Sequence, residues 1–150
     1  MKQSPKLKKI QEQLKRGIIT PKGFLGTDKR NLIDILTQDE AQVNRLGLTH
    51  EDIAKKMKFF RDEGLKVVEE WTQIDHFEVL TESMRGKFPC PFTHPGMIDK
   101  TNVTVTNKKL NKKIFFTDLQ IHLIEHHGFY QGKGSSYRLE PSDLAEILEV

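Results

Sequence analysis

The apolar residues of this chain change their spacing near residue 71, and this change restricts the fold more than any other feature. Before it, apolar side chains recur every three or four residues, as in amphipathic helices. After it, apolar and polar side chains alternate, as in strands with one buried face. We therefore expect an α+β fold, with N-terminal helices followed by a small antiparallel β-sheet and a packed helix. Residues 21–150 are predicted to form a single domain, helical over 28–72 and β-rich with a helix over 76–150.

Residues 1–20 are predicted to form a basic amphipathic N-terminal helix or arm. Leu7, Ile10 and Leu14 make an apolar stripe that lysines surround. Either the stripe docks on the rest of the protein, or the lysines reach an anionic partner. Docking is the interpretation we favour, because lysines usually solvate an exposed helix face.

Capping residues indicate where the next helices begin. One helix is expected from about residue 29 to residue 46, and another follows Thr49. Thr49 can cap that helix, and Asp52 suits its N-terminus. The apolar period continues to Trp71. Gly64 interrupts this face, which indicates either a break or a close contact with another element.

The second half of the chain is predicted to contain strands and a hairpin. Residues 76–84 alternate as a strand does. Residues 102–106 and 114–116 form two more apolar runs, joined by a polar turn over 107–111. Two such runs around a turn indicate a β-hairpin.

Two helices are predicted after the hairpin. Thr117 or Asp118 opens the first, and Gly128 ends it just after His127. This helix is apolar nearly all round, which is typical of a buried helix. A short final helix covers 141–148.

Composition limits the classes of function. The net charge of +3 is too small to indicate nucleic-acid binding by the whole domain. No apolar run approaches the roughly 18 residues of a membrane helix, and the Lys-rich start lacks the apolar segment of a secretory signal. With the single cysteine Cys90 there is no internal disulfide, so we expect a soluble protein of the reducing cytoplasm.

Four residues form a candidate metal site. Cys90 and His94 lie four residues apart in a stiff, proline-rich loop, and His122 and His126 share one face of the predicted helix. One sulfur and three nitrogens suit tetrahedral zinc. The gap between the two pairs is longer than in a standard two-Cys, two-His finger. The alternative is ordinary structural histidines with hydrogen-bond partners.

Residues His122 to His126 also read His-x-x-Glu-His. This resembles the inverted zinc-protease motif over five residues. The resemblance implies His122 and His126 as zinc ligands and Glu125 as the catalytic residue that activates water.

Two basic segments are candidates for binding anions or nucleic acid. The loop 128–138 combines glycines and aromatic residues with Lys133 and Arg138, although its spacing departs from a P-loop. The hairpin tip is rich in lysine; its basic residues are Lys108, Lys109, Lys112 and Lys113. The alternatives are a flexible glycine-rich turn and a solvated tip that protects an edge strand.

Three classes of function follow from these sites. The first is a non-catalytic module that binds a protein partner, with a structural zinc. The second is a nucleic-acid-binding protein that uses the hairpin and the glycine-rich loop. The third is a metal-dependent hydrolase that uses Glu125. We favour the first, because a catalytic role depends on a short motif that arises easily by chance.

Overall fold

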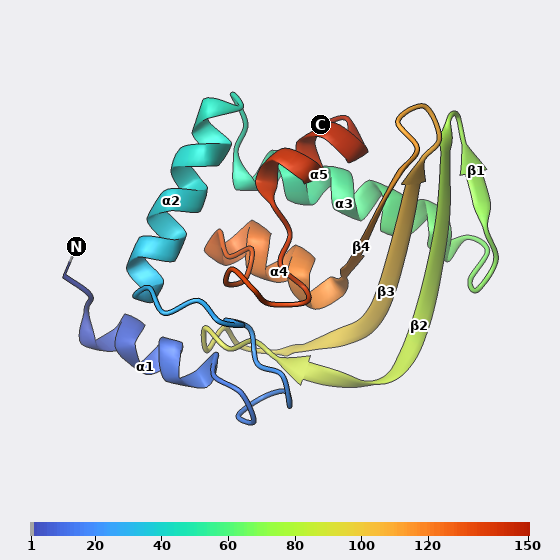
Figure 1. The fold of residues 1–150 in the computed structure, drawn as a ribbon. Helices are drawn as coiled ribbons and strands as arrows, with labels where there is room; N and C mark the ends of the chain where they lie inside the picture. Colours follow the sequence, from blue (N-terminus) through green and yellow to red (C-terminus); the bar gives the residue numbers. More distant parts are fainter. Residues whose placement is uncertain (1) are drawn as a thin grey trace.

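The computed structural model describes residues 2–150. Helices come first along the chain, then strands, then helices again (Figure 1). The elements are α1 (Pro5–Gln13), α2 (Leu32–Arg45), α3 (His50–Leu65), β1 (Thr72–Ile74), β2 (Phe77–Pro89), β3 (Met97–Asn107), β4 (Lys112–Thr117), α4 (Asp118–His127) and α5 (Pro141–Leu148). Helices and one antiparallel sheet occupy separate stretches, so the predicted α+β class is confirmed.

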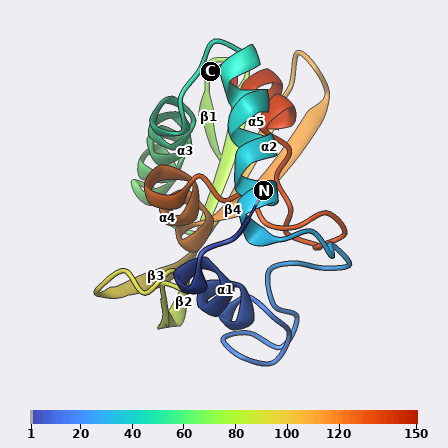
Figure 2. The same cartoon turned by 90° about the vertical axis from the view of Figure 1, so that its left-hand side faces the viewer.

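The strands form a single antiparallel sheet in sequence order, β1-β2-β3-β4. The predicted hairpin is the pair β3 and β4. β2 and β3 are longer than the alternation of apolar residues predicts. Their pairing continues past a shift in register between Met84 and Lys87, as far as the pair Pro89 and Met97. This extension carries the β2–β3 connection away from the centre of the sheet, to a place beside α1 and α4 (Figures 1 and 2).

One face of the sheet packs against α3, whose start follows the predicted cap. The Thr49 hydroxyl accepts a hydrogen bond from the Asp52 amide at 3.1 Å, and the Asp52 carboxylate accepts one from the Thr49 amide at 2.9 Å. Near the other end, Gly64 faces Thr81 of β2. A Cβ on residue 64 would lie 1.8 Å from the Thr81 hydroxyl oxygen. Gly64 therefore marks a close contact between helix and sheet.

The prediction that this helix continues to Trp71 is wrong, because α3 ends at Leu65. Beyond it, the Glu69 amide donates to the Thr81 carbonyl at 2.9 Å, and Glu69 has a φ of 65°. Trp71 lies outside the helix and is half-exposed. The sheet offers this backbone a hydrogen-bond partner that helical periodicity does not reveal.

α1 is docked through its apolar stripe. Ile10 and Leu14 are buried in the core. The side chains of Gln3 and Gln11 accept hydrogen bonds from the first backbone amides of α2, at 2.8 and 3.0 Å. These amides belong to the unpaired donors that every helix N-terminus carries, so Gln11 of α1 and Gln3 just before it complete the start of α2.

α4 lies between two hydrophobic clusters. Ile121 and Ile124 pack into the cluster beneath α3 and the sheet. Leu119 and Leu123 pack into a second cluster with residues of α1, α2 and the β2–β3 connection. Because two sides of α4 are buried in this way, His122 and His126 occupy the remaining arc of the helix.

Candidate metal centre

Three histidines, His122, His126 and His127, lie on α4, and caps hold this helix at both ends. Thr117 and Gln120 form a capping box, with side-chain hydrogen bonds of 3.0 and 3.2 Å to each other's amides. Gly128 has a φ of 61° and ends the helix immediately after His127. Both boundaries agree with the prediction from the sequence.

The β2–β3 connection brings a cysteine to these histidines. Cys90 directly follows β2 and is buried. Phe92 stacks on the ring of His127, with 4.4 Å between ring centroids and 9° between planes, and it also packs on Phe129. Aromatic contacts of this kind hold the connection against the end of α4.

Donor atoms of Cys90, His122 and His127 all lie within 4.8 Å of one another. Cys90 Sγ is 3.4 Å from His127 Nε2. His94, from the same connection as Cys90, places its Nδ1 3.1 Å from His122 Nε2. A thiol and imidazole nitrogens at this spacing could hold a metal ion.

The Cys90/His122/His127 group differs from the predicted ligand set, because it contains His127 and lacks both His94 and His126. His126 lies outside the Cys90/His122/His127 group, is largely exposed and has its Nε2 3.1 Å from the Glu125 carboxylate. The rings of His122 and His126 do lie together, at 4.8 Å between centroids. Cys90, however, approaches on the side of His127, about 140° around the helix from His122. No helical spacing rule points to His127, and only the course of the β2–β3 connection reveals it.

Two of the histidines are held in the form that binds metals. Burial lowers the pKa of His122 below its usual value, and the neighbouring His126 and His94 lower it further. Burial also lowers the pKa of His127, to about 4, with further contributions from His122 and His94. At neutral pH both imidazoles are therefore neutral, and each has a nitrogen lone pair to offer.

Glu125, the candidate catalytic residue, is paired with a lysine. Burial tends to raise its pKa, but the hydrogen bond and charge of Lys58 outweigh burial, so the pKa falls below its usual value. A general base near neutral pH needs a raised pKa rather than a lowered one. The environment of Glu125 is thus that of a structural ion pair.

The four candidate lysines lie at the tip of the β3–β4 hairpin, at the opposite end of β3 from the metal-binding group. Lys108 pairs with Glu78 at 3.4 Å, and Lys112 pairs with Glu146 at 2.5 Å. The protein's own acids thus neutralise two of them. Nucleic-acid contact through Lys109 and Lys113 stays a prediction.

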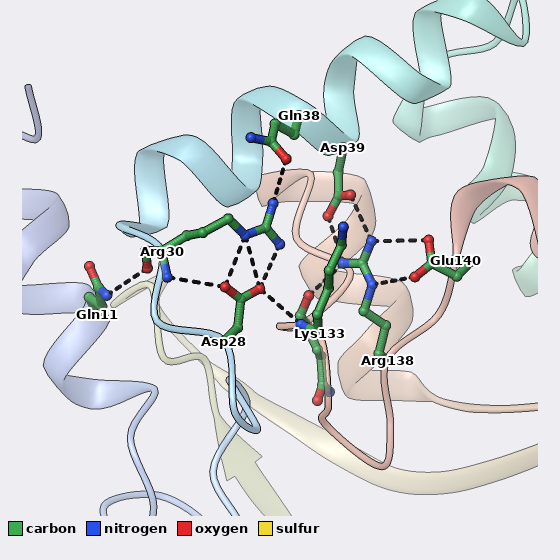
Figure 3. Close-up of polar contacts among 9 residues, drawn as sticks. Gln11, Asp28, Arg30, Gln38, Asp39, Lys133, Arg138 and Glu140 are labelled. Atoms are coloured by element: carbon green, nitrogen blue, oxygen red, sulfur yellow. Dashed lines mark hydrogen bonds and ion pairs between the residues drawn. The ribbon is translucent and has the colours of Figure 1, made fainter. Parts of the chain in front are cut away.

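The glycine-rich loop already binds carboxylate side chains of the protein itself (Figure 3). The Arg138 side chain is 7% exposed and makes two bonds of 2.8 Å to Asp39, with further bonds to Glu140. The backbone amide of Lys133 donates to the Asp28 carboxylate at 2.9 Å. Internal carboxylates surround the Arg138 guanidinium, so an external anion would compete with them, and anion binding by Arg138 stays a prediction. The Lys133 side chain itself is exposed.

Comparison with models of protein families, with curated proteins and with solved structures gives no match. Within residues 2–150, no helix has both the length and the apolar character needed to cross a lipid bilayer.

Proposed function

We propose that this protein is a non-catalytic binding module stabilised by a structural zinc ion, with Cys90, His94, His122 and His127 as ligands. Two short distances between donor atoms carry the proposal. In a tetrahedral site with Zn–N bonds of about 2.05 Å and a Zn–S bond of about 2.3 Å, two nitrogens lie about 3.3 Å apart, and sulfur lies about 3.6 Å from nitrogen. The distances of 3.1 Å between His94 and His122 and 3.4 Å between Cys90 and His127 agree with these edges within a few tenths of an ångström.

The donor set supports zinc among the common metals. One thiolate and three imidazoles suit a borderline-soft ion, whereas magnesium and calcium prefer oxygen ligands. Four protein ligands would fill a tetrahedral site and leave no position for a reacting water, which is the pattern of structural zinc. A thiolate ligand also needs Cys90 to stay reduced, so the proposal includes a reducing, cytoplasmic compartment.

The proposed ion would join two parts of the chain that are distant in sequence. Cys90 and His94 belong to the β2–β3 connection, while His122 and His127 belong to α4. A metal bond between them fixes the extended arm of the sheet against the helix that separates the two hydrophobic clusters. The module would then present a rigid surface to a partner, either another protein or a nucleic acid.

The test is metal content together with thermal stability in matched variants. Wild-type protein is loaded with zinc, desalted and analysed for metal, and Co²⁺ is substituted to record the thiolate-to-metal absorption band. We expect one zinc per chain. At free zinc one hundred times above the dissociation constant, stabilisation is about 2.7 kcal/mol, or roughly 5–10 °C in Tm. A chelator should reverse this shift.

The variants distinguish the structural ligand set from the one that the sequence suggests. Cys90→Ser, His122→Ala and His127→Ala should each lose stoichiometric zinc and the thermal shift, and Cys90→Ser should also lose the Co²⁺ thiolate band. His94→Ala should bind zinc more weakly. His126→Ala is the matched control, one residue from His127, and should bind as wild type does. Absence of zinc from the wild type, or loss of zinc in His126→Ala but not in His127→Ala, contradicts the proposal.

A further inference from the structure

A groove of about 800 Å³ lies on the face of the sheet opposite α3. Its floor includes Asn102 of β3 and Phe115 of β4, which alternate with the buried Val103 and Phe116. The loop over 19–24 and the glycine-rich loop form its walls. A groove of this volume is within the range of small-molecule sites.

Flat apolar side chains are exposed in this groove. Phe115 is 38% exposed and Tyr137 is 42% exposed, and their ring centroids lie 6.3 Å apart. Met84 and Phe88 add apolar surface from the extended part of β2. Exposed aromatic rings that lie together in a groove are typical of surfaces on which flat rings stack.

The groove is positively charged. Lys22, Arg85 and Lys100 line it, and Lys100 Nζ lies 4.4 Å from the centre of the Phe88 ring. Asp99 is the acidic residue among those lining it, and Lys87 pairs with it at 3.5 Å. Cations beside aromatic rings match a ligand that has both a flat ring and a negative charge.

The wall that carries Tyr137 is held in place by buried contacts. The buried side chain of Gln120 donates to the Tyr137 carbonyl at 2.6 Å. The loop over 19–24 is tied to the glycine-rich loop by the Gly132 amide, which donates to the Phe24 carbonyl at 2.9 Å. Just beyond the 19–24 loop, a Cβ on Gly26 would lie 2.1 Å from the Ser135 nitrogen, so this segment and the glycine-rich loop touch backbone to backbone. The groove is therefore preformed, which lowers the entropic cost of binding.

We infer that this groove binds a nucleotide unit, with its base stacked on Phe115 and Tyr137 and its phosphate beside Arg85 and Lys100. Free nucleotides and single-stranded nucleic acid share this chemistry. The inference is independent of the metal centre, since none of the four proposed zinc ligands lines the groove. It also gives the binding module a chemical class of ligand.

Binding is measured on zinc-loaded protein with three probes. These are adenosine 5′-monophosphate, a single-stranded DNA of about twelve nucleotides, and ribose 5-phosphate, which lacks a base. We expect the oligonucleotide to bind at low salt, with affinity that falls as salt rises. Phe115→Ala and Tyr137→Ala should each weaken binding about fivefold or more, because a stacked base depends on the ring. Lys100→Glu should weaken binding and reduce its salt dependence.

Two control variants match these changes outside the groove. Phe59→Ala removes a similarly exposed phenylalanine from α3, and Lys55→Glu makes the same charge change at an exposed position of the same helix. Both should bind the probes as wild type does. Zinc content is measured on every variant. Loss of nucleotide binding with zinc retained concerns the groove, whereas absence of zinc concerns the metal centre.

The probes also identify the source of the nucleotide. Equal affinity for the monophosphate and the oligonucleotide indicates a free nucleotide, whereas much tighter binding of the oligonucleotide indicates single-stranded nucleic acid. Three results overturn the inference: no binding of the monophosphate or the oligonucleotide at low salt, equal binding of ribose 5-phosphate and the monophosphate, or loss of binding in Lys55→Glu but not in Phe115→Ala.

Discussion

The buried ion pair between Asp39 and Arg138 should be among the most stabilising side-chain contacts of the protein. It joins α2 to the glycine-rich loop, whose residues wall the groove (Figure 3). Their side chains are 5% and 7% exposed, and two bonds of 2.8 Å link them. Arg138 also donates to the Gln131 carbonyl at 2.7 Å and to the partly exposed Glu140.

The cost of breaking this pair follows from what each substitution leaves behind. Removing one partner of a buried pair costs about 3–5 kcal/mol, because the other charge is left uncompensated. Asp39→Ala leaves Arg138 with Glu140, so we expect the lower end, about 3 kcal/mol. Arg138→Ala leaves Asp39 without its cation and also removes the bond to Gln131, so we expect about 5 kcal/mol. The double variant leaves neither charge buried. Its loss in the free energy of unfolding should therefore be about 3 kcal/mol smaller than the sum of the two single losses.

Urea unfolding at neutral pH measures the free energy of unfolding of the four proteins in this cycle. Glu12→Ala is the control, because Glu12 and Lys15 form an exposed pair of 2.7 Å whose loss should cost less than about 0.5 kcal/mol. A loss below about 1 kcal/mol in Asp39→Ala, or additive effects in the double variant, would refute the argument from burial.

Two more predictions concern stability. Gly64→Ala should lower the free energy of unfolding by about 2 kcal/mol, because the new Cβ would lie 1.8 Å from the Thr81 hydroxyl oxygen. Alanine ordinarily stabilises a helix relative to glycine, so a higher urea midpoint contradicts the close contact. The hydrogen bond from Arg30 lowers the pKa of the nearly buried Asp28 carboxyl from 3.8 to about 2. Ionised Asp28 therefore stabilises the fold by about 2 kcal/mol above pH 4, and this stabilisation is lost as the pH falls towards 2. Unfolding measured from pH 5 to pH 2 should show this loss in wild type, and an equal loss in Asp28→Asn would argue against it.

Elements whose signals are local could be predicted from the sequence. Thr49 with Asp52, and Thr117 with Gln120, lie within one helical turn of each other, so their capping boxes form wherever the chain is helical. Gly128 ends α4 for the same local reason. The change from helical to alternating spacing determined the α+β class, because burying one face of each element needs only the right period.

The sequence also singled out much of the candidate metal centre, but it could not choose between adjacent histidines. Helical spacing favours His126, which lies one turn from His122. Cys90 is brought to His127 by an extended β2–β3 pair and by the stacking of Phe92. That choice depends on the path of a connection that the helix does not contain.

The end of α3, the burial of Arg138 and the groove depend on tertiary contacts. Glu69 leaves the helical pattern because Thr81 of β2 offers its amide a partner. Arg138 meets Asp39 across 99 positions of sequence, and a charge that looks free in the sequence becomes part of the core. The groove combines the 19–24 loop, the sheet and the glycine-rich loop. Spacing rules describe residues within a few turns or along one strand, whereas these features depend on contacts that exist only once distant segments have packed together.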